Sequence, residues 1–195
     1  MRETETKKCK QLNQLSESQG IVIFGNGEDK TIPLGELRQA FSIEQKIYNR
    51  SFENLSIKDA IKAYEDSILP LSPETLLIHL GEADILFFTE NATEFDNYYR
   101  KLIHYIKSQN TKCHIGIVSM RNYNNNIQIE EMNRHLKYIA ESEECDYGDI
   151  SNKKVWNPIS TMDISSFVYS IGFVHPLKNK HPFYDLIKIF FCYET

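Results

Sequence analysis

The sequence predicts an α/β protein in which a parallel sheet lies between two layers of helices. Short apolar runs alternate along the chain with longer segments of helical periodicity. The runs are continuous rather than alternating in hydrophobicity, as in parallel strands that are covered on both faces. Strand and helix in alternation are typical of a sheet sandwiched by helices. We therefore expect a three-layer α/β/α sandwich.

The expected strands are β-branched or leucine-rich and end at small residues. The first, Ile21–Phe24, runs into the tight turn Gly25-Asn26-Gly27. The run Leu76–Leu80 ends at Gly81, and the run His114–Val118 ends at Ser119. A shorter run is Ile47–Asn49.

Capping residues and stop signals mark the expected helices. Ser56, with Asp59 three residues later, opens an amphipathic segment that Pro70 closes. Three further helices are expected, one opened by Thr93 with Asp96, one carrying apolar residues from Ile129 to Ile139, and one opened by Pro182.

Length and composition describe an ordinary globular protein. The chain has 195 residues, 41% of them hydrophobic and 25% charged. We expect a polar, loosely ordered tail over residues 1–19 and a single domain over residues 20–195. The net charge of −5 argues against nucleic acid and anionic membranes as partners.

Cysteine usage and hydropathy predict a cytoplasmic location. The four cysteines are widely spaced and form no Cys-x-x-Cys pair, which favours free thiols in a reducing compartment. No apolar run follows the polar start of the chain, and none approaches the roughly 20 residues of a membrane span. We expect neither a signal peptide nor a transmembrane segment.

Ligands of open parallel sheets bind beyond the carboxyl ends of the strands. The segments that follow the apolar runs are therefore the candidate functional loops. They are residues 25–29, 50–55, 81–84 and 119–123, with the irregular stretch 151–175.

These loops and their strands resemble, in order and spacing, the sequence blocks of the SGNH hydrolases, also called GDSL esterases or lipases. The matching segments are Ile21–Gly27, Tyr48–Leu55, Leu77–Ile85 and Gly172–Pro176, and the stretch Met132–Asp149 resembles the helix and short strand before the last block. The resemblance implies a flavodoxin-like sheet and an acyl-hydrolase ancestry.

The positions of the family's catalytic triad are altered in this chain. By the resemblance, Gly27 stands where the family has its nucleophilic Ser, and Gly172 stands where it has the Asp that orients the His. His175 matches the family's His base, and a structural role beside Pro176 is the competing interpretation. The remnant triad therefore has a base without its two partners.

The oxyanion hole implied by the resemblance is also incomplete. Asn54 stands in place of a glycine that supplies a backbone amide, and Ala83 in place of an asparagine that supplies a side-chain donor. With Gly27 and Gly81, these positions outline a degenerate cleft. Losing the nucleophile costs on the order of 10⁶ in turnover, so serine-dependent hydrolysis should be effectively absent.

Three functions follow as hypotheses. The first is an inactive SGNH-like protein that binds a small polar ligand or a protein partner, and the second is an active acyl-ester or carbohydrate esterase with a rearranged site. The third is a Mg²⁺-dependent phosphate-handling or receiver-type domain that uses the acidic strand-end residues Glu28, Asp29, Glu53, Glu82 and Asp84. For the first function we expect no metal and no cofactor.

Two further strand residues are interpreted as structural. His79 lies within an apolar run, which favours a satisfied core histidine. Ser119 ends a strand without a Gly-x-Ser-x-Gly elbow, so we expect it to hydrogen-bond its own loop rather than to act as a relocated nucleophile.

Overall fold

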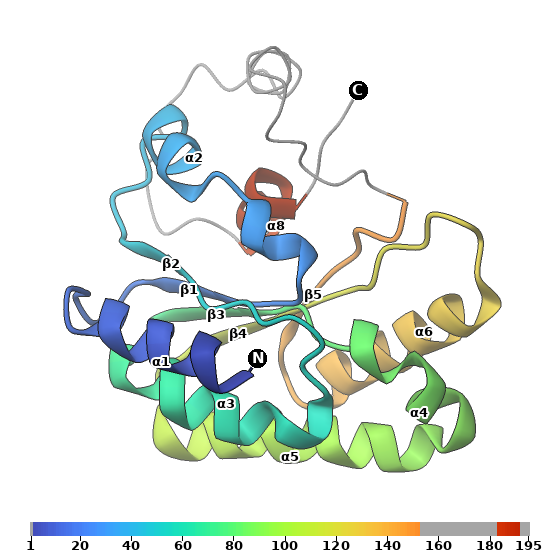
Figure 1. The fold of residues 1–195 in the computed structure, drawn as a ribbon. Coiled ribbons are helices and arrows are strands. Elements are labelled where there is room, and N and C mark those ends of the chain that lie inside the picture. The colour runs from blue at the N-terminus through green and yellow to red at the C-terminus, as the bar shows by residue number, and fades with distance from the viewer. Residues whose placement is uncertain (1, 153–182, 192–195) are drawn as a thin grey trace.

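A five-stranded parallel sheet forms the centre of the protein (Figure 1). The computed structural model describes residues 2–152 and 183–191. The strands lie in the order β2, β1, β3, β4, β5, which is the flavodoxin-like order. Their bounds are β1 Ile21–Phe24, β2 Ile47–Asn49, β3 Thr75–Ile78, β4 His114–Val118 and β5 Asp146–Gly148. The predicted parallel sheet is confirmed.

Helices cover both faces of the sheet, which confirms the three-layer architecture (Figure 1). One face carries α1 (Arg2–Asn13), α3 (Ala60–Ser67), α4 (Ile85–Glu90), α5 (Ala92–Gln109) and α6 (Ile127–Ser142). The other face carries α2 (Leu34–Ala40) and α8 (Phe183–Phe191). Within the described part of the chain, no helix is both long enough and apolar enough to cross a membrane.

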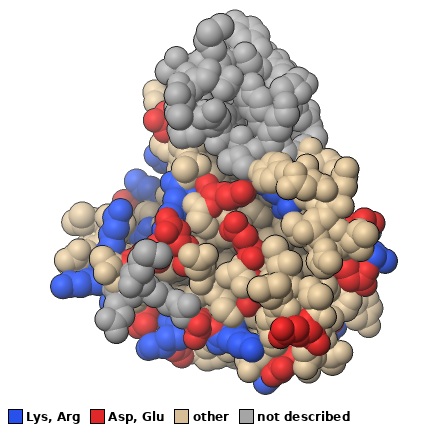
Figure 2. All heavy atoms as spheres, turned by 45° about the vertical axis from the view of Figure 1, so that its right-hand side comes forward, with Lys and Arg blue, Asp and Glu red and all other residues tan. Residues whose placement is uncertain are grey.

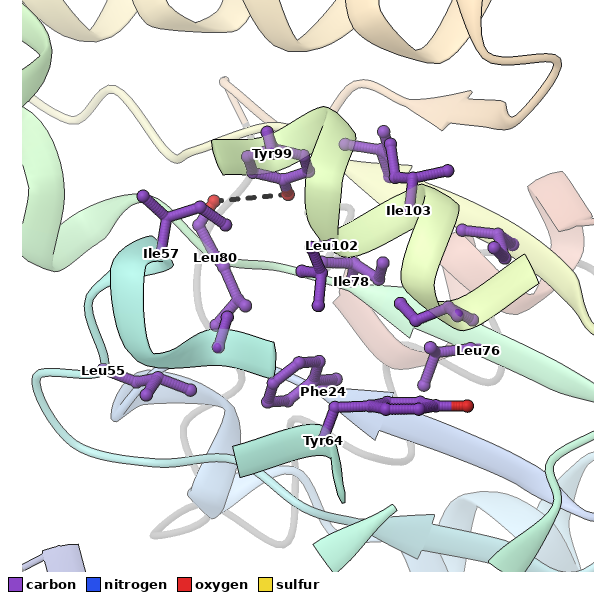
Figure 3. Packing of buried hydrophobic residues seen from close by; sticks show 14 of the residues in the cluster. Phe24, Leu55, Ile57, Tyr64, Leu76, Ile78, Leu80, Tyr99, Leu102 and Ile103 are labelled. Atoms are coloured by element: carbon purple, nitrogen blue, oxygen red, sulfur yellow. Dashed lines mark hydrogen bonds between the residues drawn. The ribbon is translucent and has the colours of Figure 1, made fainter. Parts of the chain in front are cut away.

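Alternate residues of the central strands fill two separate apolar clusters. Phe24, Ile78 and Leu80 point toward α3 and α5, where Tyr99 donates a hydrogen bond to the carbonyl of Leu80 at 3.4 Å (Figure 3). Ile23 and Leu77 point the other way and pack with residues of α2 and α8. Because both faces are buried, the strands need apolar residues at nearly every position.

The N-terminal segment forms a helix rather than the loosely ordered tail that we expect from its polarity. Cys9 is buried, and Asn13 ties the end of α1 to the body of the protein. The Asn13 amide donates to the carbonyl of Ser67 at 2.9 Å, and its oxygen accepts from Arg50 at 2.7 Å. Lys10 also pairs with Asp66 at 2.8 Å. Polar contacts therefore attach α1 to the rest of the protein. A search for apolar periodicity in the sequence cannot reveal such contacts.

Two element boundaries differ from the prediction in ways that affect the site. β3 ends at Ile78, so His79 and Leu80 follow the last strand residue. Asn91, rather than Thr93, caps α5, and its side chain accepts from the Glu94 amide at 3.1 Å. The helices α2 and α4 and the strand β5 are too short to show a periodicity in the sequence.

Candidate functional site

The cleft positions implied by the resemblance follow the carboxyl ends of three neighbouring strands. Gly27 lies after β1 and directly precedes a 3-10 helix, Glu28–Thr31. Asn54 lies after β2 with a positive φ of 52°, a conformation that glycine adopts most easily. Gly81, with φ 139°, precedes the 3-10 helix Glu82–Asp84 that contains Ala83. The predicted His175 and Gly172 lie outside the described residues.

Side chains join the three loops to one another. A Cβ on Gly27 would lie 3.3 Å from Cγ of Glu53, so the first two loops are adjacent. Asp84 crosses from the third loop to the second, where its carboxylate accepts from the Ser56 hydroxyl at 2.6 Å and from the Ile57 amide at 2.8 Å. Burial raises the pKa of the Asp84 carboxyl. Asp84 is therefore a structural bridge between loops.

A buried Asp29 and His79 pair lies at the same edge of the sheet. Both side chains are 1% exposed, and Nδ1 of His79 lies 3.0 and 2.9 Å from the two carboxylate oxygens of Asp29. The Asn26 amide donates to the same carboxylate at 2.9 Å. The ring of Phe191, from α8, meets the His79 ring edge to face at 5.4 Å. The pair connects the loop after β1 with the end of β3.

The expectation that His79 is a satisfied core histidine is wrong. Its Nε2 atom is buried and has no hydrogen-bond partner among the described residues. Buried polar atoms are nearly always paired, so an orphaned nitrogen requires an explanation. The sequence signal that could have found it is a histidine at the end of an apolar run, two residues before the Gly81 turn.

His79 lines a small pocket of about 160 Å³ beyond the ends of β1, β3 and β4. Its other lining residues are Asn26, Glu28, Glu82, Ile85, Met120, Arg121, Tyr123 and Ile129. Figure 2 turns the right-hand side of Figure 1, where the strands end, toward the viewer and shows Asp and Glu side chains gathered on that face. We call the pocket that His79 lines the strand-end pocket.

Acidic side chains dominate the electrostatics of the strand-end pocket. Loss of water around its carboxyl raises the pKa of Glu82, and the nearby Glu28 raises it further. Arg121 lies with its Nε 3.4 Å from Oε2 of Glu28. Partial loss of water around its hydroxyl raises the pKa of Tyr123 to about 12, although most of the side chain is exposed.

The five acidic residues expected at this edge do not act as one cluster. Glu28 and Glu82 face the pocket, while Asp29 is bound by His79 and Asp84 by Ser56. Glu53 pairs with Lys30 at 3.3 Å. Among the described residues, no group of three or more His, Cys, Asp or Glu side chains is placed to hold a metal ion.

Ser119 is a structural residue, but its partners lie after β5 and not in its own loop as predicted. It is fully buried, its hydroxyl donates to Asp149 at 3.2 Å, and its oxygen accepts from the Ile150 amide at 2.8 Å. These bonds join the ends of β4 and β5, and a hydroxyl held in this way is not presented to a substrate.

Replacing Ser119 with Ala should lower the free energy of unfolding by about 1–3 kcal/mol, because the Ile150 amide stays buried without its acceptor. Urea denaturation of the variant and the parent protein measures this difference. Ser108→Ala is the matched control, since that hydroxyl is exposed on α5 and bonds only its own helix. Equal losses in the two variants would contradict the role assigned to Ser119.

Comparison with known proteins gives similarity in structure but not in sequence. No protein-family model and no curated protein matches the sequence. Among solved structures, a platelet activating factor protein from Streptococcus pneumonia superposes with a TM-score of 0.66 and 16% identity, over 77% of this chain and 75% of that one.

Two further solved structures are similar over comparable lengths. A GDSL-like lipase from Bacteroides thetaiotaomicron has a TM-score of 0.59 and 13% identity, over 74% of this chain and 77% of the lipase. An SGNH-hydrolase family esterase has a TM-score of 0.55 and 16% identity, over 80% of this chain and 94% of the esterase. The chain therefore has the fold of the SGNH hydrolases.

Proposed function

We propose that this protein is an SGNH-like binding protein that has lost serine-dependent ester hydrolysis and holds a small polar ligand at the strand ends. The observation that carries the proposal is Gly27, which stands where the resemblance places the nucleophile and has no side chain. Ala83, at the oxyanion asparagine position, supports the same conclusion because a methyl group donates no hydrogen bond. A hydroxyl nucleophile cannot come from either position.

The strand-end pocket supports a binding role at the strand ends, although none of the four degenerate cleft positions is among its described lining residues. Its volume of about 160 Å³ corresponds to roughly five water molecules, so it suits a ligand with few heavy atoms. The unpartnered Nε2 of His79 gives such a ligand a fixed hydrogen-bonding partner. Asp29 holds the imidazole in place from behind.

A rearranged esterase is the second candidate, and the Asp29 and His79 pair is the observation that favours it. A histidine oriented by a carboxylate is the arrangement that activates a hydroxyl or water in hydrolases. In such an enzyme, water would attack the acyl carbon while its proton passes to Nε2 of His79. The ester C–O bond would then break as Nε2 returns that proton to the leaving alcohol oxygen. This candidate requires ester turnover that disappears when His79 is replaced.

An ester assay separates the two candidates. With short-chain nitrophenyl esters, we expect no turnover by the parent protein above that of His79→Gln and His175→Ala variants, because Gly27 supplies no nucleophile. Folding of each variant is checked by circular dichroism. A clear parent rate lost in His79→Gln would establish the rearranged esterase, and a rate lost in Ser119→Ala would establish a relocated nucleophile.

We also propose a cytoplasmic location. Cys9, Cys113 and Cys145 are free cysteines, and burial raises the pKa of each thiol. Protonated thiols without disulfide partners suit a reducing compartment. Fractionation of source cells with an antibody against the protein tests this location.

A further inference from the structure

His79 is a nearly fully buried lining residue of the strand-end pocket. In a neutral imidazole, one ring nitrogen carries the proton and the other carries a lone pair. Nδ1 of His79 lies within 3.0 Å of both oxygens of Asp29, so the proton on Nδ1 points at the carboxylate. In this neutral form the lone pair is on Nε2, the atom that has no partner among the described residues.

The charges around this acceptor are mainly negative. Glu28 and Glu82 line the pocket, and the Asp29 carboxylate lies directly behind the imidazole. Among the described lining residues, Arg121 is the one Lys or Arg side chain, and it lies beside Glu28. Glu82 and Asp29 therefore give the pocket an excess of negative charge, which favours a cation over an anion.

The remaining walls suit the carbon atoms and the charge of a small cation. Ile85, Met120 and Ile129 are apolar, and Tyr123 adds an aromatic ring at an exposed position. An aromatic face attracts ammonium groups in addition to the attraction of carboxylates. A pocket of about 160 Å³ limits the ligand to a few heavy atoms.

We propose that the strand-end pocket binds a small primary ammonium compound, with Nε2 of His79 and the Glu82 carboxylate accepting hydrogen bonds from its nitrogen. The proposal rests on the proposed binding function and specifies its ligand class. The ammonium group supplies three donors, which matches a site built from acceptors. Arg121 then serves to compensate Glu28 rather than to bind the ligand.

Three probes of similar size and different charge test the ligand class. They are 2-aminoethanol, ethane-1,2-diol and glycolate, titrated into ¹⁵N-labelled full-length protein while the His79 ring and Asn26 amide resonances are followed by NMR. We expect saturable shifts with 2-aminoethanol and at least about tenfold weaker binding of the neutral diol, because a charged hydrogen bond is lost. Glycolate should bind no better than the diol.

A charge-removing variant assigns the binding to the pocket. Glu82→Gln should weaken 2-aminoethanol binding by about tenfold or more, whereas Glu36→Gln, an exposed change on α2, should leave it unchanged. Glu82 lies at the exposed rim, so this variant is expected to fold even if changes at His79 do not.

The outcomes separate this inference from the function on which it rests. Tighter binding of glycolate or the diol overturns the ammonium ligand and leaves a binding protein with another specificity. No saturable shift with any probe, or equal effects of the two glutamine variants, also overturns it. Failure of the proposed function would instead appear as ester turnover in the separate assay.

Discussion

Gly25→Ala is expected to lower the free energy of unfolding by about 1–3 kcal/mol and to displace the Asp29 carboxylate from His79. A Cβ on Gly25 would lie 2.0 Å from Oδ2 of Asp29 and 2.8 Å from Oγ of Ser51. The carboxylate is buried and bonded on both oxygens, so it cannot turn aside without losing partners. Thermal unfolding and the NMR resonance of the His79 ring measure the two effects.

Gly35→Ala is the matched control for this prediction. A Cβ on Gly35 would meet none of the described residues within 4 Å, and Gly35 lies in α2. The same chemical change should there be neutral or stabilising by about 0.5–1 kcal/mol, because alanine favours helix. A Gly25→Ala protein as stable as the parent, with an unchanged His79 resonance, would contradict the tight packing around Asp29.

The triple variant Gly27→Ser, Ala83→Asn, Gly172→Asp should gain measurable ester hydrolysis, whereas we expect none from the parent chain. In an intact triad the nucleophile is worth on the order of 10⁶ in turnover, and one oxyanion donor about 10² to 10³. Among the described residues, the Cβ of a serine there would lie 3.3 Å from Cγ of Glu53 and 4.0 Å from its Cα, so a small shift of the flexible Glu53 side chain accommodates it. Nitrophenyl ester turnover measures the gain.

The control for the triple variant carries Ala at position 27 with the other two changes. It keeps the asparagine donor and the aspartate but lacks the hydroxyl, so any rate above it comes from the new serine. A triple variant that folds as the parent does and shows no rate above this control would mean that the loops no longer hold the geometry that the resemblance implies.

The fold was largely predictable because buried parallel strands leave a strong local pattern. The runs Ile21–Phe24 and His114–Val118 coincide with β1 and β4. The run Leu76–Leu80 extends beyond β3, because Leu80 packs under Tyr99 and does not pair in the sheet. The apolar pattern does not reveal β5, an edge strand of three residues, and only the resemblance across Met132–Asp149 indicated it.

The site was less predictable because its central contact joins two residues that are far apart in the sequence. Asp29 and His79 are 50 residues apart, and nothing in the local sequence of either one names the other. Asp29 was expected among several carboxylates facing a cleft, but its burial depends on the close approach that Gly25 permits. Strand-end position predicted the right loops, whereas side-chain partners depend on packing that a single sequence does not display.

The all-parallel sheet also has a consequence for how quickly the protein folds. Ile21 of β1 pairs with Ile47 on one side and with Thr75 on the other, so neither neighbour is close along the chain. Parallel pairs need a crossover segment, and here no hairpin can form early to seed the sheet. Closing such loops costs chain entropy before the contacts form, which slows folding. Refolding should therefore be rate-limited by assembly around β1, with the isolated strands gaining little order on their own.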